Sequence, residues 1–290
     1  MTIGRIAGDG ERVRIKIATA GGAMAAVREW EFAGTHGAVT ARAWTRPDPR
    51  YVAVLAHGYG EHLGRYHHVA DALVAAGATV CGPDHLGHGR SAGEPVLIED
   101  VADVVADLHT LVASARDDHP DLPVVLVGHS MGGLVAARYA QTRGGLAALV
   151  LSGPVLGRWG ALEDLLAAAT IPDDPIDTAT LSRDPAVGAA YAADPLVWHG
   201  PFKRPTLEAL DAALRAARDA GGLGALPTLW VHGADDRLVP LAGTRTGIDA
   251  LRGTDLTEIV YPGARHEVFN ETNRAGVLSD VTTWIASRIP

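Results

Sequence analysis

Short apolar runs alternate along the chain with segments whose apolar residues recur at helical spacing. Such runs are typical of strands buried on both faces of a parallel sheet. We expect strands of this kind at 51–56, 79–81, 124–127, 147–151, 228–231 and 256–261. Between them, the spacing predicts helices at 66–76, 101–112, 134–140 and 277–287. The alternation predicts an α/β fold with a mostly parallel, doubly wound sheet.

Two parts of the chain depart from this alternation. Segments 30–32 and 39–44, separated by a glycine-containing turn, predict two antiparallel strands at one edge of the sheet. From Pro154 to about Arg204 no strand pattern occurs, and prolines interrupt the helical fragments at positions 172, 175, 185, 195 and 201. We interpret this part as a helical cap, at 154–204, inserted into a core formed by 29–153 and 205–290.

Residues 1–28 are predicted to be an N-terminal extension and are a candidate for disorder. Basic residues and an Ala/Gly-rich run between Arg12 and Val27 resemble a weak signal peptide, but alanine and glycine make a poor apolar core. We therefore expect a cytoplasmic or peripherally lipid-associated protein rather than a secreted one. Met24 is an alternative natural start, and an intact Thr2 found by mass spectrometry would exclude it.

The composition excludes several classes of protein. With 290 residues and 47% apolar content, the chain can bury one large core or two smaller ones. A formal net charge of -9 argues against a nucleic-acid partner, which would need clustered Lys and Arg, and against binding to anionic surfaces. Cys81 is the only cysteine, so no intrachain disulfide is expected, and no apolar stretch reaches the length of a membrane span.

A candidate nucleophile lies directly after the expected strand at 124–127. Gly128 to Gly132 fit the pattern G-x-S-x-G, and a helix-compatible segment follows, which is the strand-turn-helix context of a nucleophile elbow. The turn is expected to hold Ser130 in a strained backbone conformation that costs about 1–3 kcal/mol. A serine hydroxyl needs a histidine to take its proton and a carboxylate to orient that histidine, here in the order Ser, acid, His.

The C-terminal third supplies both partners. Asp235 and Asp236 lie in a loop after the expected strand at 228–231, and spacing alone does not choose between them. His266 follows the next expected strand and is the predicted base. Histidines at 62, 67, 68, 85 and 88 could suggest a metal, but they lie in loops that a hydrolase architecture already explains. The segment after His266 is no H-E-x-x-H motif because position 270 is Asn, so we expect neither metal nor cofactor.

Two backbone amides are expected to bind the oxyanion that forms when the serine attacks an ester. Met131 supplies one, as the residue after the nucleophile. The His57-Gly58-Tyr59-Gly60 turn supplies the other through the Tyr59 amide, because its glycines let the loop approach the site. Each such donor typically stabilises the transition state by about 3–4 kcal/mol.

With these motifs in place, the chain resembles the α/β-hydrolase superfamily and, more narrowly, the monoacylglycerol lipases, especially their bacterial members. The resemblance runs from about Trp30 to the C-terminus and is carried by segments 57–66, 84–91, 128–133, 182–185, 191–197 and 261–271. The elbow is generic to serine hydrolases, whereas the oxyanion-turn and cap segments together are specific. The resemblance implies an α/β-hydrolase fold with a helical cap.

The resemblance also implies site residues. The family's acid immediately precedes an Arg-Leu pair, here 237–238, which selects Asp236. Glu61, Arg65 and Tyr191 match positions that shape the polar end of the pocket around the glycerol moiety, although an exposed or structural polar role is as compatible with the sequence. The first half of the cap, 154–180, departs from the family pattern, which leaves the preferred acyl chain open.

We therefore predict a serine ester hydrolase that cleaves monoacylglycerols to fatty acid and glycerol through an acyl-enzyme. An esterase, lactonase or lysophospholipase acting on other small amphiphilic esters is the nearest alternative, and a non-catalytic ligand-binding protein of this fold is a remote one. The leucine-rich segment Leu156–Leu166 either packs on the core or lines an apolar channel, and it suggests transient contact of the cap with a lipid interface. The sequence leaves the oligomeric state open.

Overall fold

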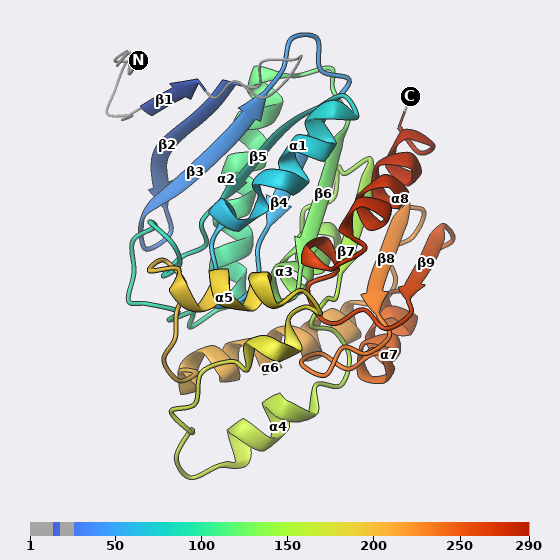
Figure 1. Cartoon of the computed structure of the whole chain (residues 1–290). Helices are drawn as coiled ribbons and strands as arrows, with labels where there is room; N and C mark the ends of the chain where they lie inside the picture. The colour runs from blue at the N-terminus through green and yellow to red at the C-terminus, as the bar shows by residue number, and fades with distance from the viewer. Residues whose placement is uncertain (1–13, 18–25, 290) are drawn as a thin grey trace.

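A computed structural model describes residues 14–17 and 26–289. In this part of the chain, strands form a single sheet in the order β1-β2-β3-β5-β4-β6-β7-β8-β9 (Figure 1). They are β1 (Arg14–Ile17), β2 (Ala26–Gly34), β3 (Gly37–Thr45), β4 (Tyr51–Ala56), β5 (Ala78–Pro83), β6 (Val124–His129), β7 (Ala148–Ser152), β8 (Thr228–Gly233) and β9 (Leu256–Tyr261). From β5 to β9 every neighbouring pair is parallel, whereas β1, β2 and β3 pair antiparallel at the edge. The predicted sheet is confirmed.

Helices cover both faces of the sheet. On one face, α1 (His67–Ala75) and α8 (Arg274–Ala286) pack against Val125 and Val127. On the other face, α2 (Val101–Asp118), α3 (Met131–Thr142), α6 (Arg204–Ala220) and α7 (Leu241–Leu251) pack in the core that contains Leu126. Successive side chains of a strand point to opposite faces, and in β4, β5, β6, β7 and β8 every residue is buried. These strands are therefore largely apolar, as expected of a doubly wound α/β sheet, whereas the edge strand β9 is partly exposed.

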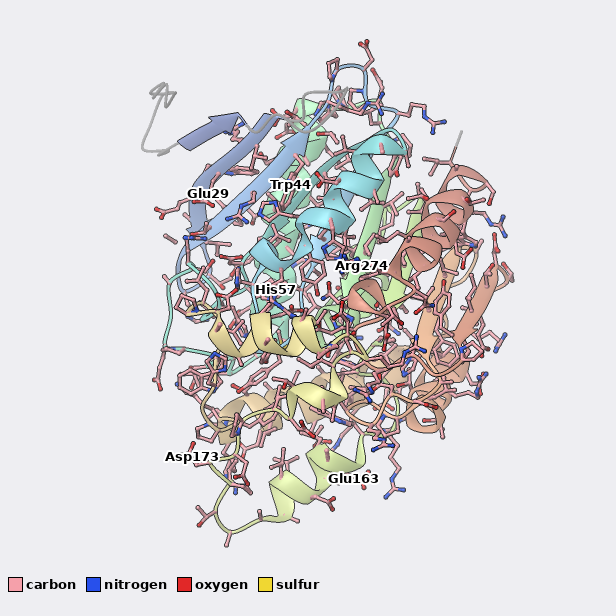
Figure 2. The ribbon with its side chains drawn as sticks, in the orientation of Figure 1. Glu29, Trp44, His57, Glu163, Asp173 and Arg274 are labelled. Carbon is pink, nitrogen blue, oxygen red and sulfur yellow. The ribbon has the colours of Figure 1, made fainter. Side chains whose placement is uncertain are left out.

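The segment between β7 and β8 is helical. It contains α4 (Gly160–Ala167), the 3-10 turn η2 (Thr178–Thr180) and α5 (Pro185–Ala193) before α6 begins, and these elements lie beyond the carboxyl ends of the parallel strands (Figure 1). Asp184 starts α5 by accepting a hydrogen bond from the Ala186 amide, and Pro185 occupies the first turn, where its missing amide costs nothing. Charged side chains such as Glu163 and Asp173 project from the α4 region (Figure 2). The boundaries 154 and 204 of the cap remain a prediction.

Most predicted elements coincide with observed ones. β4 and β9 match the expected bounds, and in the edge hairpin Trp30 pairs with Ala41 and Phe32 with Val39. Two helices, α6 and α7, were not predicted. β1 and the start of β2 fall within the predicted N-terminal extension, while Thr2 and Met24 lie outside the described residues. Over 14–17 and 26–289, no helix combines the length and apolar character that crossing a membrane requires.

Candidate active site

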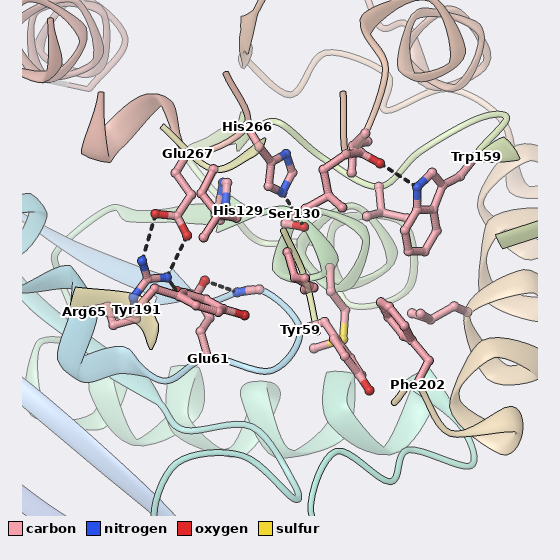
Figure 3. A pocket seen from close by; sticks show the side chains of 18 residues that line it. Tyr59, Glu61, Arg65, His129, Ser130, Trp159, Tyr191, Phe202, His266 and Glu267 are labelled. Carbon is pink, nitrogen blue, oxygen red and sulfur yellow. Dashed lines mark hydrogen bonds and ion pairs between the residues drawn. The ribbon is translucent and has the colours of Figure 1, made fainter. Parts of the chain in front are cut away.

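Four loops meet at the carboxyl ends of the parallel strands. Figure 3 shows Tyr59, Ser130 and His266, from separate loops, around one pocket. The loop after β4 carries Tyr59, and the turn after the adjacent β6 carries Ser130. The loops after the neighbouring strands β8 and β9 carry Asp236 and His266. All four residues are at this edge because the carboxyl ends of parallel strands share one edge, where ligands of open α/β sheets bind.

The turn at Ser130 is strained, as predicted. Ser130 has φ 53° and ψ -120°, a conformation that a residue with a side chain rarely adopts and that typically costs about 1–3 kcal/mol. Two glycines allow it: a Cβ at Gly128 would lie 2.3 Å from the Gly132 carbonyl oxygen, and one at Gly132 would lie 2.1 Å from the Ala56 carbonyl oxygen. Strand and helix therefore pass closer to each other than any side chain would permit.

The structure brings Ser130, His266 and Asp236 together. His266 Nε2 lies 2.9 Å from Ser130 Oγ, and His266 Nδ1 lies 2.7 Å from Asp236 Oδ2. Asp236 is buried and its Oδ1 accepts hydrogen bonds from the Leu238 and Val239 amides at 2.9 and 2.8 Å. Asp235, the other candidate, is exposed. Of the two aspartates, only Asp236 has the geometry of an orienting acid.

The electrostatics fit a charged acid beside a basic imidazole. Burial alone would raise the pKa of Asp236, but the charge of His266 and hydrogen bonds from His232 and His266 bring it well below the ordinary value. Burial would lower the pKa of His266, yet Asp236 raises it overall. An ionised carboxylate only accepts hydrogen bonds, so His266 Nδ1 carries the proton and Nε2 is free to accept the hydroxyl proton of Ser130.

The loop after β4 is held against the nucleophile. A Cβ at Gly58 would lie 3.2 Å from Ser130 Cβ, and the Gly58 amide donates to Glu61 Oε1 at 2.7 Å. His57 Nε2 accepts a hydrogen bond from the His85 amide, so the neutral ring carries its proton on Nδ1 and donates it to the Gly58 carbonyl at 2.8 Å.

This contact fixes a peptide plane. Burial holds the pKa of His57 well below its ordinary value, which keeps the ring neutral. The Gly58 carbonyl and the Tyr59 amide belong to one planar peptide and point in opposite directions, so fixing the first orients the second. The donation of the Tyr59 and Met131 amides to an oxyanion stays a prediction.

A polar cluster forms one end of the pocket beside Ser130. Arg65 Nη1 lies 2.5 Å from Glu61 Oε2 and 2.7 Å from Glu267 Oε1, and Arg65 Nη2 lies 2.8 Å from Glu267 Oε2. The Tyr191 ring lies 4.8 Å from the Arg65 guanidinium carbon. Burial would raise the pKa of Glu267, but the Arg65 charge lowers it to about 2. We call Glu61, Arg65, Tyr191 and Glu267 the polar cluster; Glu267, which the sequence analysis missed, is its new member.

The opposite end of the pocket is aromatic (Figure 3). The rings of Tyr59 and Phe202 stack with centroids 4.4 Å apart, and Trp159 meets Phe202 edge-on at 6.3 Å. The Trp159 indole donates to the Leu238 carbonyl at 2.8 Å, which fixes its ring. The pocket and its mouth hold about 510 Å³. Within the leucine-rich segment, Leu156 and Leu162 pack in the core, and Trp159 lines the pocket.

The remaining histidines near the site have no metal-binding arrangement. His129 Nδ1 contacts the Ser152 carbonyl at 3.0 Å, and its ring lies 4.8 Å from that of His266. Burial and the charge of His266 lower the pKa of His129 to about 4. Among residues 14–17 and 26–289, no group of three or more His, Cys, Asp or Glu side chains could hold a metal ion.

Comparisons with known proteins agree with this geometry. The profile of the serine aminopeptidase S33 family matches residues 47–273. A monoacylglycerol lipase from Mycolicibacterium smegmatis is 44% identical over 90% of this chain and 98% of its own length. The chain belongs to the monoacylglycerol lipase family of the α/β-hydrolase superfamily.

Solved structures of similar proteins support this assignment. A monoacylglycerol lipase from Paleococcus ferrophilus superposes with a TM-score of 0.74 at 27% identity, over 86% of this chain and 99% of that one. A carboxyl esterase from Bacillus coagulans, solved in complex with glycerol, superposes with a TM-score of 0.77 at 26% identity, over 91% of this chain and 99% of that one. The chain is a serine hydrolase with the α/β-hydrolase fold, as the sequence predicted.

Proposed function

We propose that this serine hydrolase cleaves monoacylglycerols to fatty acid and glycerol through an acyl-enzyme on Ser130. One observation carries the proposal: the Ser130 hydroxyl lies between a polar cluster and an aromatic wall of the same pocket (Figure 3). A monoacylglycerol has the matching form, because its ester bond joins a small polar alcohol to a long apolar chain. The acyl chain lies along Tyr59, Trp159 and Phe202, and the glycerol moiety faces the polar cluster.

The reaction follows from the positions of the protons. Ser130 Oγ attacks the ester carbon while His266 Nε2 takes the hydroxyl proton, and Asp236 stabilises the imidazolium that forms. The Tyr59 and Met131 amides bind the oxyanion. His266 returns the proton to the departing glycerol oxygen. Glycerol is released, and the acyl group stays bound to Ser130 as the acyl-enzyme. A water molecule, deprotonated by His266, then releases the fatty acid and restores Ser130.

The names of the relatives support the choice of substrate. The mycobacterial relative is a monoacylglycerol lipase, and the match covers 90% of this chain and 98% of the relative. The Bacillus coagulans esterase was solved with glycerol bound, so a similar fold accommodates that alcohol. The aromatic end here suits an acyl chain, since apolar and aromatic side chains dominate ligand pockets of this kind.

The polar cluster argues against an aminopeptidase, the activity for which the matching family is named. Binding a substrate ammonium group requires a carboxylate that has no cationic partner. Here Glu267 forms a bidentate ion pair with Arg65 and also accepts a hydrogen bond from Asn270. Glu61 accepts hydrogen bonds from Arg65, the Gly58 amide and Tyr66. The carboxylates are already neutralised or hydrogen-bonded within the chain, which favours a neutral polyol over a cation.

Contact with a lipid interface is the second part of the proposal. Leu165 and Leu166 on α4 and Ile171 after it pack against the core but are only half-buried, so each leaves apolar surface exposed. We expect wild-type protein to co-sediment with neutral liposomes more than Leu165→Glu does. Equal co-sedimentation of the two proteins would refute contact through α4 and would leave the catalytic proposal intact.

Two experiments test the catalytic proposal. A fluorophosphonate probe should label the folded wild type on Ser130 and should not label Ser130→Ala. A panel of monoacylglycerols, diacylglycerols, p-nitrophenyl esters, lysophospholipids and lactones should then give the highest kcat/KM with a monoacylglycerol. No labelling of Ser130 would refute the enzyme mechanism, whereas preference for a lactone or an aryl ester would refute the substrate and favour the esterase or lactonase alternative.

A further inference from the structure

We propose that His232, held by Trp230, is a positioning residue for Asp236, the acid that orients His266, so that five residues act as one hydrogen-bonded chain: Trp230, His232, Asp236, His266 and Ser130. The inference rests on the proposed function, because it assumes that Asp236 and His266 serve Ser130. It extends that function to two residues that neither the motifs nor the pocket lining points to.

Strand β8 places the first two members together. Trp230 and His232 are two positions apart, so their side chains leave the same face of the strand. The Trp230 indole nitrogen lies 3.1 Å from His232 Nδ1, and the two rings meet edge-on at 5.6 Å. An indole N–H can only donate. His232 Nδ1 must therefore accept, and in the neutral ring the proton lies on Nε2.

That proton faces two acceptors. His232 Nε2 lies 2.9 Å from the Val239 carbonyl oxygen and 3.2 Å from Asp236 Oδ2. Neither oxygen can donate when the carboxylate is ionised, so both compete for the Nε2 proton: the Val239 carbonyl is the nearer acceptor, and Asp236 Oδ2 is the second and longer one. In the alternative tautomer, the unprotonated Nε2 would face two oxygen acceptors without a hydrogen bond. Its Nδ1 proton would also point at the indole proton of Trp230. Trp230 thus selects the tautomer that supports Asp236.

Four N–H groups then face the Asp236 carboxylate, two at each oxygen. Two backbone amides, of Leu238 and Val239, hold Oδ1, and two imidazole N–H groups, of His232 and His266, meet at Oδ2. The side chains of His232 and Asp236 are fully buried, so solvent has no access to replace a missing donor. The amides fix one oxygen, and His232 fixes the other at 2.7 Å from His266 Nδ1. His232 thereby sets the carboxylate plane that orients the base.

A packing role and a positioning role predict different results. If His232 only fills space, a polar side chain of suitable size at position 232 leaves the pH dependence of the reaction unchanged. If it donates to Asp236, removing the donor makes the carboxylate more basic, and Asp236 then holds the His266 imidazolium more firmly. The acid limb of kcat/KM then moves to higher pH. The other ionisable groups that face His266 are Glu61, His129 and Glu267, and substitutions at 232 leave them in place.

Two amide side chains separate these roles. In His232→Asn the amide reaches the position of Nδ1, so it can accept from Trp230 but cannot reach Asp236. In His232→Gln the amide reaches the position of Nε2 and can donate to Asp236. Both variants keep a buried polar group at position 232, and they differ by a single methylene. Comparing them tests the donor to Asp236 separately from burial and polarity.

The experiment measures kcat and KM from pH 5 to 9 for wild type, His232→Asn and His232→Gln with a p-nitrophenyl ester, after fluorophosphonate titration of Ser130 and a thermal melt of each protein. In His232→Asn we expect the acid limb to rise by about half a pH unit and kcat to fall roughly tenfold, with KM within about twofold. His232→Gln should recover most of both changes.

Trp230→Phe keeps the Nε2 donor but no longer fixes the tautomer, and we expect an intermediate shift of the acid limb in this variant. It also keeps the test decisive if His232→Asn fails to fold. If Ser130 is still labelled, an acid limb at the wild-type pH in His232→Asn would overturn the inference. If His232→Asn does not fold, the same result in Trp230→Phe would overturn it. Absence of labelling in the wild type would instead refute the proposed function on which the inference rests.

Discussion

Replacing Arg65 with methionine is expected to destabilise the fold and to make its stability increase on acidification from pH 7 to 5, a range in which the wild-type contribution of Glu267 is constant. Arg65 is the cation of the polar cluster, and its side chain is only 10% exposed. The partners Glu61 and Glu267 are 4% and 5% exposed. Methionine fills a similar volume without charge, so Arg65→Met leaves two buried carboxylates without their counter-ion. Removing one partner of a buried ion pair typically costs about 3–5 kcal/mol.

The pKa of Glu267 gives a second measure of the magnitude. In the wild type it is lowered from the ordinary value of 4.5 to about 2, which corresponds to roughly 3 kcal/mol. A lowered pKa in the folded state adds stability that is fully present above pH 4.5 and is lost as the pH falls toward 2. The wild type therefore becomes less stable on acidification through this window.

The variant should respond to acidification in the opposite direction and at higher pH. Without Arg65, burial dominates and raises the pKa of Glu267 above its value in the unfolded chain. The folded state then takes up a proton more readily than the unfolded state, so the free energy of unfolding increases as the pH is lowered from 7 toward 5. At neutral pH we expect Arg65→Met to be about 3–5 kcal/mol less stable than the wild type.

The assay is urea denaturation followed by circular dichroism between pH 4 and 8. Arg245→Met is the matched control, because Arg245 pairs with Glu258 at the surface, where their side chains are 42% and 29% exposed, respectively. The free energy of unfolding of this variant should fall by less than about 1 kcal/mol. Arg65→Met/Glu267→Gln should be more stable at neutral pH than Arg65→Met. A loss below about 1 kcal/mol in Arg65→Met, or stability that falls on acidification to pH 5, would refute the buried ion network.

Three further predictions concern the pocket and the elbow. Asp236→Asn should lower kcat by about 10⁴-fold while the matched variant Asp235→Asn stays within about twofold, because only Asp236 contacts His266; equal losses in p-nitrophenyl ester hydrolysis would contradict this. Ser130→Gly should abolish activity and raise the melting temperature, since glycine relieves about 1–3 kcal/mol of backbone strain at φ 53°; an unchanged or lower melting temperature would argue against the strain. Phe202→Ala should shift the kcat/KM optimum toward longer or branched acyl chains by opening the aromatic end of the pocket, and an unchanged chain-length profile would place the acyl chain elsewhere.

The apolar pattern predicted the sheet because the parallel strands β4 to β8 are buried on both faces. β4 and β9 were placed at their observed bounds, and the elbow at Ser130 was located from its glycines and its flanking elements. The pattern missed α6 and α7. Gly243 and Gly247 lower the helix propensity of α7, but they lie where α7 passes the 157–158 backbone: a Cβ at either would come within 2.2 Å of it. Tertiary packing therefore outweighs local propensity in this helix.

Two of the site residues that the sequence analysis missed, Glu267 and Phe202, are defined by contacts between distant segments, and a third, His232, by how its own loop folds. Glu267 meets Arg65 across 202 positions of sequence, and nothing local marks it except that it follows His266. His232 looks like the end of an ordinary buried strand until Asp236 folds back over it. Phe202 joins the pocket only because the segment before α6 brings it against Tyr59. Motif spacing predicts residues of a known pattern, whereas Glu267 and Phe202 depend on how separate loops meet, and His232 depends on the path of the loop that carries Asp236.

Intact-protein mass spectrometry of the wild type, after rapid acid quenching during turnover of a monoacylglycerol and with free glycerol measured in parallel, tests the acyl-enzyme directly. We expect a mass increase equal to one acyl group, located on Ser130 by peptide mapping, together with release of glycerol. Ser130→Ala should show neither. Glycerol release that continues in Ser130→Ala, or an acyl group found on another residue of the wild type, would contradict this mechanism.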